Sequence, residues 1–136
     1  MKDNSISLGA TGAAKKPEPG NKKDEVSIDT GKLLWMPGEY VEAQNGTHNV
    51  FFGTDKDSVT NATIANPLGT TVFQGLAKDS NNVTLDRLEY ATNYFWRVDE
   101  VNNPASSGTN TGLVWNFKTE LGGYKILPAS IINVTS

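Results

Sequence analysis

Residues 94–102, YFWRVDEVN, bring Arg97 and the adjacent carboxylates Asp99 and Glu100 together with three aromatic rings. A pair of carboxylates can act as general acid and general base in glycoside hydrolysis. Neighbouring residues of a β-strand point to opposite faces, however, so a strand would separate Asp99 from Glu100. We therefore do not expect these two side chains to form an acid/base pair.

His48 is the only histidine in the chain. Metal sites that use two histidines are therefore excluded, and a Ser-His-Asp triad would have to be built around this one side chain. His48 opens a predicted strand directly after the turn sequence NGT, residues 45–47. We expect a solvated residue at a strand end. Loss of an activity with His48→Ala or Asp99→Asn would instead indicate an enzyme.

Asp55 and Asp57 form a D-x-D pair that could belong to a calcium site or to a charged turn. Calcium needs about six oxygen ligands, and the residues that follow do not continue the ligand series of an EF-hand. A charged turn is therefore the favoured interpretation. The sequence also has no Gly-rich phosphate loop and no nucleophile elbow. We predict no catalytic residue, no metal site, no cofactor and no enzymatic activity.

The composition limits the partners. The chain has 136 residues, which suffices for one domain with a buried core. The net charge is -3 and no basic stripe is present, so nucleic acid is not an expected partner. The absence of cysteine excludes disulfides. No apolar run approaches the length of a membrane span, about 18 residues, and residues 1–16 lack the apolar centre of a signal peptide. We expect no membrane insertion, and any export signal would lie upstream or be absent.

Short runs of β-branched and aromatic residues fill residues 26–120 and are separated by turn-forming clusters about every ten residues. This rhythm is typical of an all-β sandwich or barrel. One helical turn within residues 58–65 is the most helix that we expect. The seven predicted strands, the number in a simple immunoglobulin-like sandwich, are residues 25–29, 32–36, 48–54, 70–75, 82–86, 94–102 and 113–119.

Alternation along these strands predicts one apolar layer between two sheets. Tyr94 and Trp96 fall on one face of their strand, whereas Phe95 and Arg97 fall on the other. We expect the tryptophans to fill the core rather than to stack on a ligand. The predicted structural core comprises Trp35, Phe52, Leu88, Tyr94, Trp96, Trp115 and Phe117.

Residues 88–102, LEYATNYFWRVDEVN, resemble the fibronectin type III pattern, in which a Leu six residues before a Tyr forms the corner that leads into a strand. In such corners the Tyr hydroxyl hydrogen-bonds to the nearby backbone, which implies a structural role for Tyr94. Five motifs more closely resemble a bacterial fibronectin type III-like subfamily with LSWTPG, VYFGTD, YYWRVDEVN and VWSFTT. They are LLWMPGEY (33–40), VFFGTD (50–55), NPLGT (66–70), YFWRVDEVN (94–102) and VWNFKTE (114–120).

This resemblance implies an immunoglobulin-like, seven-stranded β-sandwich at residues 17–121 with extended terminal tails, an N-terminal tail or linker at 1–16 and a strand-like tail at 122–136. Modules of this kind are frequent in large secreted or surface proteins of planctomycetes and other environmental bacteria. An extracellular or cell-surface location is therefore implied. The family consists chiefly of spacers, adhesion modules and accessory domains, and it supplies no shared catalytic residues.

In the strand order of that family, Phe51, Phe95 and Val114 would lie together on the outer face of one sheet. Contiguous apolar patches tend to mark contacts. One interpretation is that Arg97 and Lys118 cover the rings with their alkyl stems. The other is a protein contact, with this chain's own tail or a neighbouring module; stacking on a sugar is a weaker option.

The C-terminal segment, residues 122–136, is unusually apolar for a tail. SIINVT, residues 130–135, would need a partner edge for its backbone. It could begin a following module, fold back as an eighth strand, or be donated to the next copy, which would give a filament. SISL, residues 5–8, could act similarly. The candidate strand-donating residues are Ile126, Leu127, Ile131, Ile132 and Val134.

The sequence thus predicts a non-catalytic structural or interaction module. It would act as a spacer or in assembly through strand and sheet-face contacts, with a neighbouring module or other copies of itself as partner. The alternative is a carbohydrate-binding accessory module of a polysaccharide-degrading enzyme, which would bind polysaccharide through Phe51 and Phe95. We expect four glycosylation sequons to be unused, at Asn45, Asn61, Asn82 and Asn133.

Overall fold

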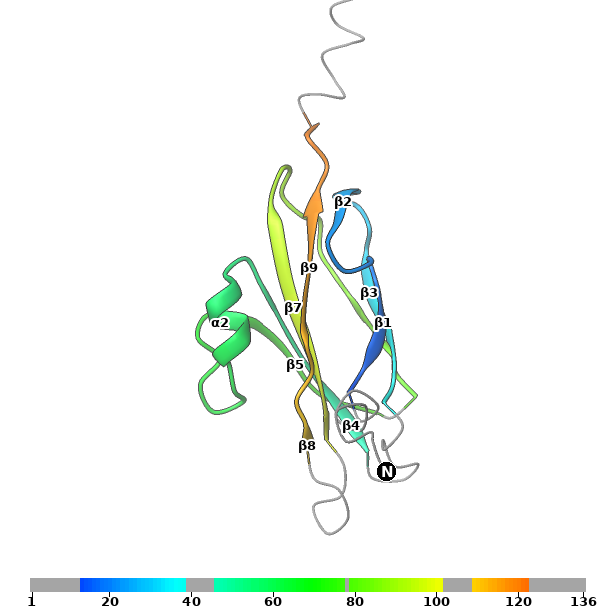
Figure 1. The fold of residues 1–136 in the computed structure, drawn as a ribbon, viewed down its shortest axis with the longest axis vertical. Coiled ribbons are helices and arrows are strands. Elements are labelled where there is room, and N and C mark those ends of the chain that lie inside the picture. The colour runs from blue at the N-terminus through cyan, green and yellow to red at the C-terminus, as the bar shows by residue number, and fades with distance from the viewer. Residues whose placement is uncertain (1–12, 39–45, 78, 102–108, 123–136) are drawn as a thin grey trace, which may run out of the picture.

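The computed structural model describes residues 13–38, 46–77, 79–101 and 109–122. These residues form two β-sheets packed face to face, with one short helix on the outside of the larger sheet (Figure 1). The smaller sheet has the order β1 (Lys15–Glu18), β3 (Lys32–Met36), β6 (Asn82–Thr84). The prediction of an all-β sandwich is confirmed at this level.

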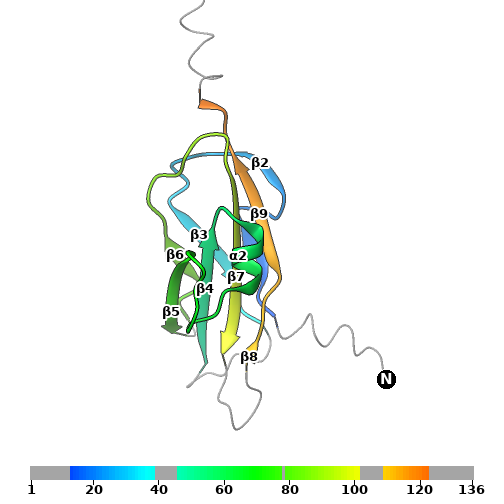
Figure 2. The same ribbon diagram turned by 90° about the vertical axis from the view of Figure 1, so that its left-hand side faces the viewer.

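The larger sheet carries most of the candidate residues. Its order is β2 (Lys23–Val26), β9 (Val114–Thr119), β7 (Asn93–Val101), β4 (Thr47–Gly53), β5 (Thr71–Ala77), and β8 (Thr109–Asn110) also pairs with β7. Among the described strands, only β2 and β9 pair in parallel. The helix, α2 (Lys56–Asn61), lies over the outer face of this sheet (Figure 2). Each predicted strand overlaps an observed one, but the described residues hold nine strands rather than seven.

The strand β1 was not predicted. Its sequence KKPE is charged and contains a proline, so it has the composition of a linker. It nevertheless pairs antiparallel with β3, with Glu18 opposite Leu34. Ala13 and Ala14, directly before it, are buried. The folded region therefore extends N-terminal to residue 17, where the sequence placed its start.

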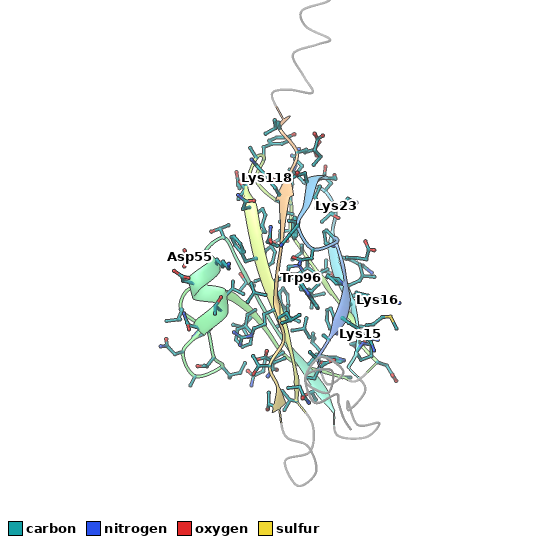
Figure 3. All side chains as sticks on the ribbon, in the orientation of Figure 1. Lys15, Lys16, Lys23, Asp55, Trp96 and Lys118 are labelled. Atoms are coloured by element: carbon teal, nitrogen blue, oxygen red, sulfur yellow. The ribbon has the colours of Figure 1, made fainter. Side chains whose placement is uncertain are left out.

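The space between the two sheets is filled by apolar side chains, as alternation requires. Trp96 is fully buried between the layers (Figure 3), and its ring meets Trp35 and Trp115 edge-on at centroid distances of 6.3 and 4.9 Å. Each such aromatic ring contributes on the order of 2–3 kcal/mol to stability. All the side chains of the predicted core belong to this cluster: Trp35, Phe52, Leu88, Tyr94, Trp96, Trp115 and Phe117.

Tyr94 fixes the corner that leads into β7. Its ring lies between Phe52 and Phe117, with centroids 5.2 and 5.6 Å away. Its hydroxyl accepts a hydrogen bond of 2.8 Å from the backbone N–H of Glu89. Leu88, beside that N–H, is buried. The bond ties the loop before β7 to the strand itself, which is the structural role expected for Tyr94.

A second apolar cluster lies on the opposite, outer face of the larger sheet. Phe51 of β4 packs there against Val59 and Ala62, from α2 and the residue after it. Phe95 and Val114 lie against the edge of the same cluster. From the sequence, this face was expected either to be covered by the stems of Arg97 and Lys118 or to contact a protein. In the structure, α2 covers it, and Phe51 is only 1% exposed.

Candidate functional site

Arg97 is the most highly connected polar side chain on the outer face. It is 4% exposed and projects from β7 beneath α2. Its Nε and Nη2 donate to the two carboxylate oxygens of Asp99, both at 2.9 Å. The remaining N–H groups donate to three carbonyl oxygens at the end of the helix: Val59 (2.6 Å), Thr60 (3.1 Å) and Ala62 (2.8 Å). A guanidinium has five N–H donors, so its donor capacity is used within the chain.

The same guanidinium also covers an aromatic ring. Its Cζ lies 4.2 Å from the centroid of Phe51, the residue opposite Arg97 on β4. Arg97 therefore covers Phe51, as one interpretation of the sequence expected, but its charged head and α2 take part in the cover. Cover by the alkyl stem of Lys118 stays a prediction. Asp99 in turn accepts a hydrogen bond of 3.0 Å from the N–H of Gly112. The cluster joins α2, the sheet and the turn before β9.

His48 and Glu100 form a second polar pair on the inner face. They are opposite one another on β4 and β7, and both are fully buried. Nδ1 of His48 contacts Oε1 of Glu100, and the N–H of Gly38 donates to Oε2 at 2.8 Å. Trp35 meets the His48 ring edge-on at a centroid distance of 5.4 Å. The prediction of a solvated His48 is wrong, because His48 shares the inward face of β4 with Val50 and Phe52.

These two pairs separate the groups that could have acted together in catalysis. Asp99 binds Arg97 on one face of β7, while Glu100 binds His48 on the other. The expectation that the adjacent carboxylates do not form an acid/base pair is confirmed by this geometry. Across the described ranges, no three His, Cys, Asp or Glu side chains lie close enough together to hold a metal ion.

Asp55 acts as the N-cap of α2. Its carboxylate accepts hydrogen bonds from the hydroxyl and the N–H of Ser58, at 2.8 and 2.9 Å. The Ser58 hydroxyl, and then the Ser58 N–H, lower the pKa of Asp55 below its ordinary value. Asp57 lies in the first turn of the same helix. The D-x-D pair thus begins a helix, which is a more specific role than the charged turn predicted.

Only part of the predicted interaction surface remains accessible. Phe95 and Val114 are half-buried, whereas Phe51 is buried under α2 and Arg97 and is no longer a candidate for a contact. The tail residues Ile126, Leu127, Ile131, Ile132 and Val134 and the SISL segment lie outside the described residues. The glycosylation candidates Asn61 and Asn82 are themselves exposed.

A groove that was not predicted from the sequence lies along one flank of the sandwich. It measures about 330 Å³ and runs between β5 of the larger sheet and the residues that follow β6 in the smaller one. Phe52, Phe73 and Leu85 supply its apolar lining. Phe73 is only partly buried although it packs against the main core. The available signal was Phe73, an aromatic residue in the predicted strand at residues 70–75.

Comparison with known proteins gives no independent identification. No protein-family model matches the sequence, and no curated protein matches it. Among the described residues, no helix is long and apolar enough to cross a membrane.

Proposed function

We propose that the chain is a non-catalytic, fibronectin type III-like module of a secreted or surface-displayed bacterial protein. It acts as a spacer or in assembly through the edges and faces of its sheets. One observation carries this proposal: the side chains best suited to chemistry are engaged inside the fold. Arg97 and Asp99 attach α2 to the sheet, and His48 and Glu100 join two strands in the core.

The fibronectin-like part of the proposal is supported by the Tyr94 corner. The hydroxyl bond to the Glu89 N–H is the contact that the resemblance implied. The motif order along the chain supports the same family, and the location outside the cell follows from that resemblance. The partner in this proposal is a protein, either a neighbouring module or another copy of this chain.

The carbohydrate-binding alternative is less well supported. It depended on Phe51 and Phe95 as stacking rings, and a sugar needs an open ring face. Phe51 is 1% exposed, and the Arg97 guanidinium occupies the space over its ring. One half-buried phenylalanine is a poor platform, so we retain the structural role as the proposal.

Light scattering of the full chain beside a version that ends at Glu120 tests assembly. The truncation preserves β9 and the two backbone hydrogen bonds of Glu120, to Val26 and Ala91, so the sandwich should stay folded. We expect particles larger than a monomer from the full chain and monomers from the shorter one. Ile132→Asp in the full chain is the matched control and should also give monomers. Indistinguishable monomers throughout would reject assembly and leave the spacer role.

A further inference from the structure

We propose that the outer edge of β5 accepts a strand from a second copy of the chain, namely residues 130–135. This inference rests on the proposed role in assembly and identifies its acceptor and donor. It follows from the chemistry of the sheet edges, the position of the flank groove and the direction of the strands.

The edges of the described sheets differ in their protection. Unpaired strand edges invite pairing with other chains, and proteins usually protect them with charges, prolines or short length. The edge strand β1 is KKPE and β2 is KDEV, so charges or a proline occupy both, while β6 has only three residues. By contrast β5, TVFQGLA, has seven residues with neither charge nor proline. Its pairing with β4 has one irregularity, between Phe73 and Leu76, but in length and in lack of charge and proline it is the least protected edge that the described strands present.

The edge of β5 also lies beside apolar surface that an added strand could cover. Phe73 is opposite Val50 on β4, so its side chain faces the space between the sheets. It lines the flank groove together with Phe52 and Leu85. A strand paired with β5 would place every second side chain over this groove. Backbone pairing and burial of partly exposed apolar surface would therefore occur together.

Residues 130–135, SIINVT, have the pattern for that position. They carry no charge, and Ile132 and Val134 share one face of an extended strand while Ile131 and Asn133 share the other. With Ile132 and Val134 over the groove, Asn133 would lie on the outer side. That is also the side of Gln74, which is exposed and follows the inward-facing Phe73.

Strand direction favours a second copy over the chain's own tail. The pairs β5–β4, β4–β7 and β7–β9 are all antiparallel, so β5 runs opposite to β9. Suppose that a second copy has the same orientation and lies beyond the C-terminal end of β9. A segment that continues in the direction of β9 would then run antiparallel to β5 of that second copy. A tail that turned back onto its own sandwich would be parallel to β5. Antiparallel pairing is slightly more stable per residue, and the repeated contact builds a filament.

Cysteine cross-linking tests the acceptor directly, because the chain has no cysteine of its own. The single variants Gln74→Cys and Asn133→Cys are mixed and oxidised. Directly opposed residues of antiparallel strands have Cα atoms about 4.5–5.5 Å apart, which lies within the Cα range that a disulfide spans, about 4.4–6.8 Å. We expect a mixed dimer in several-fold higher yield than when Asn133→Cys is mixed with Lys23→Cys on β2 or Asn82→Cys on β6. Ile131→Cys lies on the same face as Asn133. It replaces Asn133→Cys in a second mixture, in case the donated strand pairs with β5 in a register shifted by two residues.

Three outcomes would overturn the inference. One is equal yield at all three edges, and another is preferred coupling to β2 or β6. The third is an internally linked monomer from the double variant Gln74→Cys/Asn133→Cys. Light scattering of the unoxidised parent shows separately whether the chain assembles at all. If large particles form but Gln74→Cys does not cross-link preferentially, the proposal that β5 is the acceptor is rejected and assembly is retained. If no large particles form, assembly itself is rejected.

Discussion

Replacement of Arg97 by alanine is expected to lower the free energy of unfolding by about 3–5 kcal/mol, as removal of one partner from a buried ion pair typically does. Asp99 would remain buried without its cation, and the carbonyls of Val59, Thr60 and Ala62 would lose their donor. The apolar cluster around Phe51 would also lose its cover.

Urea unfolding followed by tryptophan fluorescence measures this loss, and the chain supplies its own control. Arg87 pairs with Asp29 at 3.5 Å, but both side chains are about two-thirds exposed. Arg87→Ala should therefore cost less than about 1 kcal/mol. Arg97→Lys should fall between the two, because an ammonium keeps the charge without the planar fork. Equal stability of Arg97→Ala and Arg87→Ala would contradict the structural role.

The Glu100→Ala variant should lose a comparable amount, about 3–5 kcal/mol. Its carboxylate accepts the Gly38 N–H and contacts His48, and the pair is fully buried. Alanine would remove both contacts and leave a cavity beside the buried His48 ring. The double variant His48→Leu/Glu100→Leu should recover much of the loss, because replacing a buried pair with apolar side chains of similar size is often neutral.

The same unfolding experiment compares the single and double variants. Recovery in the double variant would identify the pair as part of the core. If the double variant were as unstable as Glu100→Ala, the polar contacts themselves would be required. An enzymatic activity of the parent protein that both variants abolished while they stayed folded would contradict the non-catalytic assignment.

Alternation was sufficient to predict the core layer. The inward positions of Tyr94 and Trp96 depend only on the period-two geometry of β7, which does not change with the neighbouring strands. The same geometry predicts His48 and Glu100 on the inner face, in phase with Val50 and Trp96 respectively. Their burial was not predicted, because His48 was assigned to solvent on account of its polar side chain and not by its position along the strand. Only the register between β4 and β7 shows that the two side chains meet.

The elements that were missed or predicted only in part are those whose stability comes from tertiary contacts. The helix α2 overlaps the single helical turn expected within residues 58–65, but its six residues are too few to show an apolar stripe, and Val59 is its only buried residue. It is held by Arg97 and by the Asp55 cap. The strand β1 has a polar sequence because it lies at an edge. The position of β5 at an edge of the described sheet could not be predicted either, since it depends on the order of strands.

Hydrogen exchange of the β5 backbone amides tests strand acceptance most directly. The full chain at concentrations that give large particles is compared with the version that ends at Glu120. Amides on the outer edge of Thr71–Ala77 should exchange slowly in the full chain and rapidly after truncation, because an added strand would engage them in hydrogen bonds. Amides of β7, in the middle of the sheet, should be protected in both. Equal, rapid exchange of the β5 edge in both proteins would contradict strand donation to this edge.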